Sequence, residues 1–564
     1  DTPAGFWRVV STTSTTITAR TTNFFAVRNG ALSFYVNDAG TVGDVYTVAA
    51  GSPTNWLAST NRPIDSLSTA LALYDVEPGD VVYVDTGAYT NTVNPRVGRL
   101  DSGSSSTVVR VVGSTNEYYG GSRLYRSSRG VSDYGLHLDA AEWVAISNLT
   151  FRNAGTGLRV DDSSVISLGK VFLTGHASNG VQILNSSNVV FARVLSADNG
   201  LYGVEAQDNR SVAWQYSVLW SNRQGGVMAI GGDLSLSNSA VQASGSGHYI
   251  YQLVSNAVVR ADFNAVLADD QANVANDGGT VSKSLIRWQQ TRTNDVHTQS
   301  QNPLFADAPN GDYHLRSQAG RYSVAVTNFV TTDTNTSTLI DSGDPLAVYG
   351  SEQAPNGARV NIGLHGNDGQ ASKSRTNGWL LALTLSDGGN VRGTNNLYWV
   401  AGGVATSHLV YIDYSADGGT TWSNVATNVS ASVGVVIWNT TSFRSTSRGR
   451  WRVVSQTDSS IRDETDIYFA LNNEALAYYV NDTSTIHDVY CSAVGSADHD
   501  GLSEDSPLPS VQDVLDRYDL VPGDRILVDT GTYPMTSNLA VRSAVSGVAS
   551  NRLVIQGSTN WVYG

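Results

Sequence analysis

A period of about 23 residues constrains the fold of this chain more than any other feature of its sequence. Between residues 135 and 247, glycines open successive short segments of alternating apolar and polar residues, at spacings of 22, 23, 23 and 23. Alternation places one face of a strand inward, and its recurrence at a fixed period indicates coils that stack on one another. The glycines are Gly135, Gly157, Gly180, Gly203 and Gly226.

Apolar pairs form two ladders when these coils are stacked. The first ladder is Leu136 and Leu138, Leu158 and Val160, Val181 and Ile183, Val204 and Ala206, then Val227 and Ala229. The second is Val144 and Ile146, Ile166 and Leu168, Val189 and Phe191, Val212 and Trp214, then Leu234 and Leu236. Leu195 and Val218 indicate a third inward strand. The pattern predicts an all-β fold with a right-handed parallel β-helix, since parallel crossovers are almost always right-handed.

One corner of each coil carries a polar residue at similar spacing. These residues are Asn153, His176, Asn199 and Asn222. We predict that their side chains form a ladder with hydrogen bonds along the axis of the β-helix.

Stacked coils need covered ends, because open strand edges invite uncontrolled pairing. Residues 63–75 begin with Pro63 and carry apolar side chains at the spacing of one helical stripe. We therefore predict short capping helices, one near 63–75 and one in the corresponding later segment. The stripes are Leu67, Ala70, Leu71 and Tyr74, then Val511, Val514, Leu515 and Tyr518.

The sequence also repeats itself at an offset of 444 residues. Phe6-Trp-Arg-Val-Val-Ser returns as Arg450-Trp-Arg-Val-Val-Ser, and no insertion or deletion interrupts the matches further along the chain. Because the last 120 residues restart the first 120, we expect a tandem array of which this chain holds one period and an overlap. Further matching pairs are Tyr35-Val-Asn-Asp with Tyr479-Val-Asn-Asp, Pro78-Gly-Asp with Pro522-Gly-Asp, and Val84-Asp-Thr-Gly with Val528-Asp-Thr-Gly.

Four regions follow from these patterns. Residues 1–32 are expected to be C-terminal strands of a preceding immunoglobulin-like domain, since a ribbon of two strands is marginal alone. Residues 33–375 are predicted to form the β-helix. Residues 376–473 are predicted to form an immunoglobulin-like β-sandwich, and residues 474–564 the N-terminal cap and first coils of the next β-helix.

The sandwich prediction depends on seven short alternating segments, as in immunoglobulin-like folds. They lie near 380–385, 396–400, 408–414, 422–426, 433–438, 450–455 and 465–471. Ser415-Ala-Asp-Gly-Gly-Thr-Thr-Trp422 matches the Asp-box of sialidase-type propellers. A single box indicates a hairpin, since Asp417 can bond turn amides and Gly418-Gly419 admit positive φ.

Over residues 34–375 the chain resembles the pectate-lyase-like right-handed parallel β-helix modules of large bacterial extracellular proteins. The marks of this resemblance are Tyr35-Val-Asn-Asp, Glu77-Pro-Gly-Asp, Val84-Asp-Thr-Gly, Asn302-Pro-Leu-Phe, Gly311-Asp-Tyr-His-Leu, Ile340-Asp-Ser-Gly-Asp-Pro and Pro355-Asn-Gly. They imply an architecture and specify no reaction. Residues 376–473 are similar to the immunoglobulin- or fibronectin-like linker domains of such proteins.

Composition limits the partners. The net charge of −15 argues against nucleic acid or an anionic membrane, and no run of about 18 apolar residues predicts membrane insertion. Cys491 is the only cysteine, so no disulfide can form within the chain. Neighbouring repeats, copies of the chain in a fibre, and a glycan remain as expected partners.

The resemblance implies a test for catalysis, because enzymes of this class cut acidic polysaccharides with aspartates and an Arg or Lys base. The best cluster is Arg159, Asp161 and Asp162, with His176 one coil on and Asp208 and Arg210 two coils on. Gly175-His176-Ala177 departs from the Gly-His-Gly of hydrolases of this fold, and no Arg-Ile-Lys is present. Outward residues of a solenoid are also expected to be charged. We therefore assign no catalytic residue.

Asp498-His-Asp-Gly501 has the alternating carboxylates that can wrap Ca²⁺ before a glycine turn. The positions at the 444 offset are the uncharged Thr54, Trp56 and Leu57. No cofactor is therefore assigned, and Ca²⁺ stays open for the second copy only. His137, His248 and His314 are interpreted as surface or turn residues.

The sequence thus predicts a non-enzymatic structural repeat of a giant extracellular filament or bacterial cell-surface protein. β-Helical rods would alternate with sandwich linkers, with adhesion as an added role. The alternative is a polysaccharide lyase or glycoside hydrolase acting on an acidic glycan along the β-helix face.

Overall fold

The computed structural model describes residues 2–562 except 6, 15, 17, 21–24, 28–29, 56–58, 519, 536–537, 540 and 542–550. The chain forms two compact units. One comprises Asp1–Ala240, Leu253–Arg260 and Tyr322–Val330, and the other comprises Val241–Gln252, Ala261–Arg321 and Thr331–Gly564. Both are mostly β, which confirms the predicted fold class.

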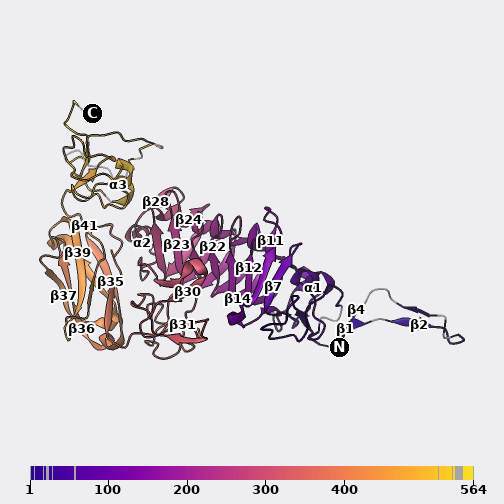
Figure 1. Ribbon diagram of the computed structural model, residues 1–564. Coiled ribbons are helices and arrows are strands. Elements are labelled where there is room, and N and C mark those ends of the chain that lie inside the picture. The colour runs from indigo at the N-terminus through magenta and orange to yellow at the C-terminus, as the bar shows by residue number, and fades with distance from the viewer. Residues whose placement is uncertain are drawn as a thin grey trace. The chain divides into compact units, whose positions relative to one another are not determined.

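The first unit is built from three stacks of parallel strands, two of which are joined because β12 and β14 run through both (Figure 1). Stack one holds β5 (Ser33–Val36), β6 (Val81–Val84), β9 (Val109–Gly113), β12 (Glu142–Arg152), β14 (Ser164–Thr174), β16 (Ser187–Ala192), β19 (Arg210–Gln215), β22 (Asp233–Ser237) and β25 (Val258–Asp262). Stack two adds β7 (Gly87–Asn91), β10 (Ser122–Arg126), β17 (Leu195–Ala197) and β20 (Val218–Trp220). Stack three holds β8 (Arg96–Gly98), β11 (Tyr134–Asp139), β13 (Thr156–Asp161), β15 (Val181–Leu184), β18 (Tyr202–Gln207) and β21 (Gly225–Ile230).

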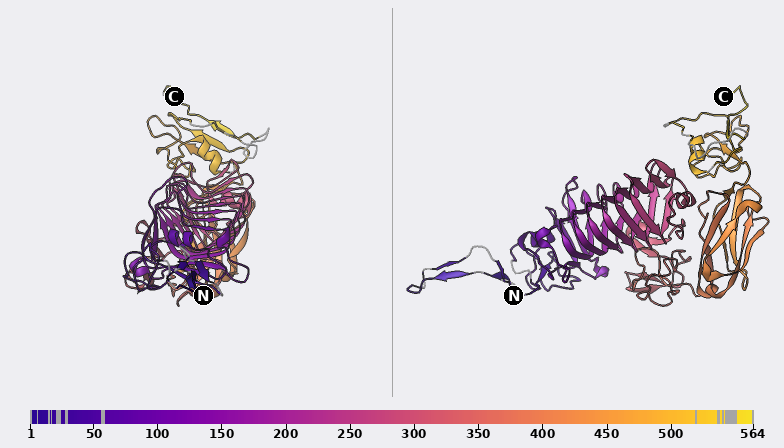
Figure 2. Two further views of the ribbon diagram at one scale, coloured as in Figure 1. Left: turned by 90° about the vertical axis from the view of Figure 1, so that its right-hand side faces the viewer. Right: turned by 180° about the vertical axis from the view of Figure 1, so that it is seen from behind.

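The predicted apolar ladders form the core of these coils. Leu158 pairs with Val181 and Val181 with Val204, and all three side chains are fully buried. In stack one, Phe191 and Trp214 pair in register and their rings stack with centroids 4.0 Å apart. Burying each such side chain contributes roughly 1.5–3 kcal/mol, so a ladder stabilises every coil it crosses. Figure 2 shows the strands of successive coils side by side.

Each coil turns at corners that use a left-handed residue followed by a buried polar or small one. At the corner between stacks three and one, the φ values are 53° at Ala140, 47° at Asp162, 48° at Asn185 and 51° at Asp208. Asn, Asp and Gly adopt this region most readily. The polar composition of this corner therefore has a backbone cause.

At three corners, the side chain of the residue after the left-handed one accepts a backbone N–H from the neighbouring coil. At the corner predicted from sequence, the backbone N–H of His176 donates to Asn199 Oδ1 at 3.1 Å, and that of Asn199 to Asn222 Oδ1 at 3.2 Å. The predicted ladder thus exists, but Asn153 is not part of it. Asn153 is the left-handed residue, with φ 60°, and Ala154 occupies the ladder position because that coil is one residue shorter.

Two other corners carry ladders that the sequence analysis missed. At one, Ala141 N–H donates to Ser163 Oγ at 3.0 Å, Ser163 N–H to Ser186 Oγ at 3.1 Å, and Ser186 N–H to Asn209 Oδ1 at 2.8 Å. At the other, Val194 and Ser217 donate to the hydroxyls of Ser217 and Ser239. These side chains satisfy amides that would otherwise be buried without a partner.

A capping helix lies at the predicted position. α1 (Leu67–Leu73) begins at Ser66, whose hydroxyl accepts from Thr69 N–H at 3.1 Å. The helix starts four residues after Pro63 because Ile64 is bridged to Val36 and holds the chain extended. Its buried residues include Leu67, Ala70 and Leu71, as the stripe predicted.

The Val84-Asp-Thr-Gly motif is explained by a buried carboxylate. Asp85 has no exposed surface, and it accepts hydrogen bonds from the backbone N–H groups of Val45, Tyr46 and Thr47 at 2.7–2.8 Å and from that of Thr86 at 2.8 Å. The hydroxyl of Thr47 adds a fifth bond at 2.8 Å. The motif therefore holds the 44–47 loop against the end of β6.

Later coil strands belong to the second unit. They are β23 (Ala240–Ser244), β24 (Tyr249–Val254), β26 (Ala265–Asp269) and β27 (Asn273–Asp277), followed by β28 (Thr280–Ser282). β28 pairs with β27 in antiparallel orientation. The parallel strands of stack three end at Asp277, whereas Gln299 continues the parallel pairing through an isolated bridge with Ala265. The extension of the β-helix over residues 293–375 stays a prediction. That segment holds only β29 (Phe305–Asp307) with β30 (Asp312–Leu315), and β31 (Arg321–Ser323) with β32 (Asn328–Val330).

A helix that the sequence did not predict follows this antiparallel turn. α2 (Leu285–Arg292) begins at Ser284 and buries Trp288 completely. The Trp288 indole donates to Asp295 Oδ2 at 3.0 Å, while Thr298 donates to Asp295 Oδ1 at 2.7 Å. Burial raises the pKa of Asp295 in spite of these bonds. The hydrogen bonds of Asp295 thus link α2 to the segment that follows it, at the end of the coil region.

The following segment is a two-sheet β-sandwich with a shared core (Figure 1, orange). One sheet contains β33 (Trp379–Ala382), β35 (Thr394–Gly402) and β38 (Val435–Asn439). The other contains β34 (Asn390–Val391), β36 (Leu409–Ser415), β37 (Ser423–Ser430), β39 (Thr446–Ser455), β40 (Arg462–Glu464) and β41 (Phe469–Leu471). A strand lies at each of the seven predicted positions, and β34 and β40 are additional.

The Asp-box forms the turn between β36 and β37, as predicted. Asp417 Oδ1 accepts from Ser415 Oγ at 2.7 Å and from Thr421 N–H at 2.8 Å, and Gly418 and Gly419 have φ of 73° and 99°. Hydrogen bonds from Thr421 lower the pKa of Asp417 to about 2. The box is a hairpin device in this chain.

The start of the coil pattern is built a second time. β42 (Ala477–Val480) and β43 (Arg525–Val528) pair in the same register as β5 and β6 at the 444 offset, and β44 (Val554–Gln556) follows. α3 (Val511–Arg517) begins at Ser510 as α1 begins at Ser66. Asp529 accepts from Val489, Tyr490, Cys491 and Thr530 N–H groups at 2.6–2.8 Å, as Asp85 does in the first copy.

The described strands within residues 2–27 pair as antiparallel ribbons. β1 (Thr2–Gly5) pairs with β4 (Phe25–Val27), and β2 (Arg8–Val10) pairs with β3 (Thr18–Arg20). Each of the two pairs is a separate two-stranded sheet.

Candidate functional sites

The charged cluster predicted from the sequence centres on the outward face of stack three. Parallel register aligns His137, Arg159, Gln182 and Glu205 in one row. Asp161 lies beside this row, with its Oδ2 2.9 Å from His137 Nε2 and its Oδ1 2.6 Å from Arg159 Nε. Arg159 also donates to Gln182, which donates to Glu205 Oε1 at 2.8 Å. The result is a continuous hydrogen-bonded row across four coils.

Asp161 is held as a carboxylate in this row. Partial burial opposes ionisation, but hydrogen bonds from His137 and Arg159, with the charge of Arg159, lower the pKa of Asp161 overall. A general base needs a pKa near the working pH and an oxygen within reach of the substrate proton. Asp161 meets neither condition, because its pKa is lowered and both oxygens accept bonds from the protein.

The structure separates the remaining members of the predicted cluster. Asp162 and Asp208 occupy left-handed corner positions two coils apart, with Asn185 at the same corner of the coil between them. Arg210 opens β19 and pairs with Ser187 in stack one, around the corner from Asp161. These charges do not converge with Asp161 on one point.

The structure corrects the predicted position of His176, which lies inside the coils and not on the outward face. Its side chain is 1% exposed, and its Nδ1 accepts from Ala154 N–H at 3.1 Å. Burial lowers the pKa of His176 to about 3. The imidazole is therefore neutral at physiological pH and belongs to the corner ladder.

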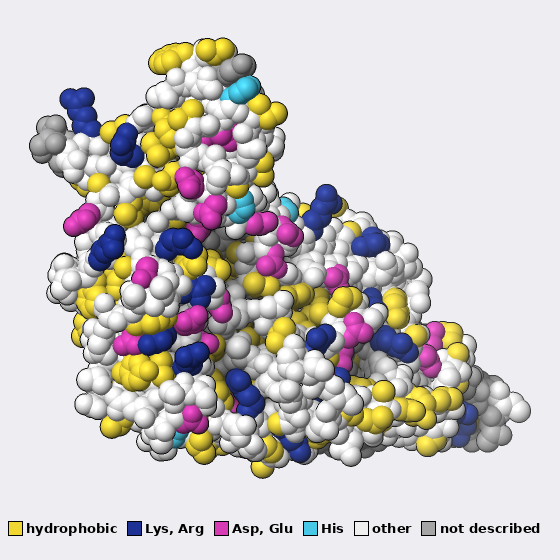
Figure 3. Space-filling model, turned by 60° about the vertical axis from the view of Figure 1, so that its left-hand side comes forward, with side chains coloured by type: hydrophobic (Ala, Val, Ile, Leu, Met, Phe, Trp, Pro, Cys, Tyr) yellow, Lys and Arg dark blue, Asp and Glu magenta, His cyan; other side chains and the backbone are white. Residues whose placement is uncertain are grey.

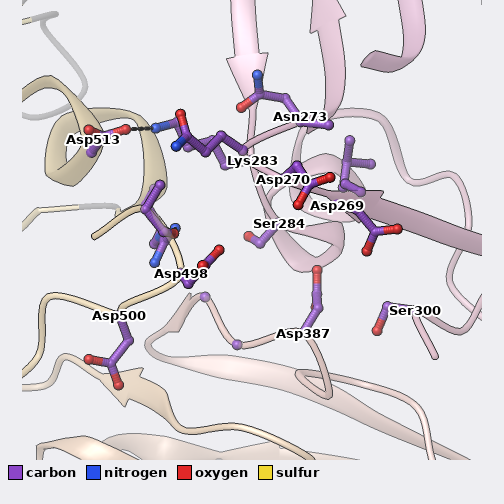
Figure 4. A pocket seen from close by; sticks show the side chains of 18 of the residues that line it. Asp269, Asp270, Asn273, Lys283, Ser284, Ser300, Asp387, Asp498, Asp500 and Asp513 are labelled. Atoms are coloured by element: carbon purple, nitrogen blue, oxygen red, sulfur yellow. Dashed lines mark hydrogen bonds and ion pairs between the residues drawn. The ribbon is translucent and has the colours of Figure 1, made fainter. Parts of the chain in front are cut away.

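A pocket of about 600 Å³ lies in the second unit, lined by residues near β26–β28, the 387–389 turn, the 497–500 loop and α3. Figure 4 shows its carboxylates spread around the wall, with Lys283 reaching Asp513. Asp387 accepts from Leu285 N–H at 2.5 Å, and burial raises its pKa to about 6. The acidic lining residues are Asp269, Asp270, Asp387, Asp498, Asp500 and Asp513.

The loop considered for Ca²⁺ borders this pocket, but its backbone oxygens are occupied. Arg517 donates to the carbonyls of Ala497, at 3.0 Å, and His499, and Tyr518 donates to that of Asp500 at 2.5 Å. Within the part of the chain that the structure describes, no three His, Cys, Asp or Glu side chains are grouped to hold a metal ion. Of the uncharged counterparts of this loop, Trp56 and Leu57 lie outside the described residues.

The three isolated histidines have structural surroundings. His137 belongs to the row described above, and His248 Nδ1 lies 2.5 Å from the carbonyl oxygen of Ser244. The expectation of a surface position is wrong for His314, which is 4% exposed. Its ring stacks on His365 at 3.7 Å, and its Nδ1 lies 2.6 Å from Asp312 Oδ1. Sequence spacing did not indicate this pair, because 51 positions separate the two rings.

Comparison with known proteins supports the fold. Residues 134–277 match the family model described as a right-handed β-helix region. No curated protein matches the chain.

Three solved structures are similar to parts of this chain, all at TM-scores below 0.5. Alginate lyase from Paenibacillus sp. str. FPU-7 is 14% identical, with a TM-score of 0.27 over 36% of this chain and 73% of the lyase. Geobacillus virus E2 ORF18 is 14% identical, with a TM-score of 0.24 over 41% of each chain. The full-length tailspike protein 2 from Escherichia coli O157:H7 bacteriophage CAB120 is 9% identical, with a TM-score of 0.17 over 78% of this chain and 55% of the tailspike. These likenesses concern the fold alone.

Charge is mixed on one face of the molecular surface. On the face drawn in Figure 3, Lys and Arg side chains are interspersed with Asp and Glu. Among the described helices, none combines the length and apolar character needed to cross a membrane.

Proposed function

We propose that this chain is a structural module of an extracellular repeat protein, in which β-helical rods alternate with immunoglobulin-like linkers. The observation that carries the proposal is the duplicated cap. Its strands, its helix N-cap and its buried aspartate recur at the 444 offset with the same strand pairing and the same backbone N–H bonds to the aspartate. A cap that is built twice fits a chain whose rods start repeatedly.

The outward row of stack three supports this role over catalysis. Its charged members neutralise one another, and its carboxylate Asp161 has a lowered pKa and no free oxygen. Neighbouring modules, or copies of the chain in a fibre, are the proposed partners. A glycan on the rod surface is the partner that an adhesive role would require.

The size of the native polypeptide tests the structural role. An antibody raised against residues 134–277 is expected to detect, in unproteolysed extracellular material, a polypeptide far larger than the 60.0 kDa of this chain. A native product of 60.0 kDa would contradict the proposal. Binding of the chain to a glycan array would add the adhesive role.

Polysaccharide cleavage is the alternative, and it makes a separate prediction. We expect the unsubstituted chain to release no more unsaturated or reducing ends from uronate polymers than an Asp161→Ala/Asp162→Ala double variant does. The physical reason is that Asp161 accepts hydrogen bonds on both oxygens and that Asp162 is a left-handed corner residue outside the strand that holds Asp161. Turnover by the unsubstituted chain that disappears in the double variant, with Asp233→Ala as a control for lost surface charge, would establish an enzyme instead.

A further inference from the structure

The ribbon β2–β3 has the same architecture as part of the sandwich. At the 444 offset, β2 corresponds to β39 and β3 to β40, and the pairs Arg8↔Arg20 and Val10↔Thr18 become Arg452↔Glu464 and Val454↔Arg462. β1 and β4 likewise pair as β39 and β41 do, with the same irregularity between the two pairs. Local sequence therefore specifies the whole ribbon in both copies.

The two copies differ in what covers them. In the sandwich, Trp451 and Val453 are fully buried and belong to a core with Ile412 and Tyr414. In the ribbon, the corresponding Trp7 and Val9 are each 58% exposed. Because the strand and its pairing register are the same in both copies, the difference in side-chain exposure comes from the neighbouring strands.

The missing neighbour can be identified from the second copy. β39 pairs on one side with β40 and on the other with β36, through Ile412↔Val453 and Tyr414↔Trp451. β2 pairs with β3 alone among the strands that the structure describes. One edge of β2 is thus open, and it carries the pattern that β36 recognises in the sandwich.

We propose that the open edge of β2 is a docking site for a sandwich segment with the sequence of residues 376–445, contributed from outside residues 2–27. Its β36 strand would pair with β2, and Trp7 and Val9 would enter the core formed by β33–β38. This inference deepens the proposed structural role by naming the partner, and it rests on that role. Main-chain pairing supplies affinity in such strand addition, while alternate side chains supply specificity.

The test supplies the partner within one polypeptide. Residues 376–445 are fused in front of Thr2 of the full chain, at the junction that corresponds to Ser445 and Thr446. Amide hydrogen exchange of residues 7–11 is then compared between the fused chain and the original. We expect exchange to slow by at least about tenfold, because the open edge becomes paired and the side chains become buried.

Two variants make the outcome specific. Ile412→Asp in the fused segment places a charge against Val9, and it is expected to restore fast exchange of residues 7–11. Trp7→Ala is expected to lower the melting temperature of the added sandwich in the fused chain and to leave the original chain unchanged.

Exchange at the original rate in the fused chain, whether it is soluble or aggregated, would overturn the inference. Equal protection in the Ile412→Asp fusion would also overturn it, because protection would then be non-specific burial. A failure of the proposed function is seen separately, as polysaccharide turnover or a native product of 60.0 kDa.

Discussion

Replacement of Asp85 by alanine is expected to destabilise the first cap by about 2–6 kcal/mol, because this buried carboxylate is the acceptor for two buried backbone N–H groups. Asp85 accepts four backbone N–H groups and the Thr47 hydroxyl. Without the carboxylate, the amides of Thr47 and Thr86 would be buried and unpaired, and each unsatisfied buried donor costs roughly 1–3 kcal/mol. The 44–47 loop is then expected to detach from the end of β6.

The measurement is local, because a chain of several domains has no single free energy of unfolding. Hydrogen exchange of the β5 and β6 amides in the full chain should accelerate in Asp85→Ala and, to a lesser extent, in Asp85→Asn, which keeps one acceptor oxygen. Asp498→Ala removes one exposed charge elsewhere and serves as the control. Unchanged exchange in β5 and β6 would show that the motif does not hold the cap.

The second copy offers an internal comparison. Asp529→Ala should have the same local effect on β42 and β43, since Asp529 accepts four backbone N–H groups as Asp85 does. Cys491 replaces Thr47 at this site, and its thiol is a weaker hydrogen-bond donor to the carboxylate than the Thr47 hydroxyl. The loss of stability in the second cap should therefore be smaller, by at most about one hydrogen bond, roughly 1 kcal/mol.

The coil core was predictable because its signal is periodic and local. Inward residues such as Val181 and Ile183 are two positions apart in a strand and one coil from their partners, so the sequence shows both spacings. The end of the coils was not predictable in this way. β28 reverses direction after Gly278-Gly279, and α2 covers only a short apolar stretch around Trp288. Neither feature repeats, so neither stands out against the period.

The candidate site shows a different limit of sequence reasoning. Asp161 and Asp162 are adjacent in sequence, yet one ends a strand on the outward face and the other turns the corner with φ 47°. A shift of one residue changes the face on which a side chain lies. His176 was placed among outward charges for the same reason, since spacing alone does not distinguish a buried corner from an exposed one.

The corner ladder at His176 leads to a prediction about acid stability. An unfolded histidine gains its proton as pH falls through about 6.5, whereas His176 in the coil stays neutral until the pH approaches about 3. Between these values the unfolded chain binds the extra proton, so stability is lost as pH falls. Each unit of difference in pKa is worth about 1.4 kcal/mol.

We therefore expect His176→Asn to remove part of this acid sensitivity. Asn199 and Asn222 already occupy the same corner in the next two coils, and each accepts a backbone N–H through Oδ1. The side-chain oxygen introduced by His176→Asn can accept from Ala154 N–H as the imidazole does. Register places the Phe151 carbonyl where Leu173 receives the Asn199 amide, so the introduced side-chain N–H₂ also has an acceptor.

Native-state hydrogen exchange of the coil amides of β13 to β19, compared between variant and unsubstituted chain at pH 7 and at pH 4, measures the effect locally in the full chain. The difference in stability between His176→Asn and the unsubstituted chain should shift by about 3 kcal/mol in favour of the variant between pH 7 and pH 4. His176→Leu separates titration from hydrogen bonding, because it should be less stable than His176→Asn at both pH values while equally lacking the acid-dependent loss. If the unsubstituted chain and His176→Asn lose stability in parallel between pH 7 and pH 4, burial of a neutral imidazole is not the cause, since carboxylate titration is common to both chains.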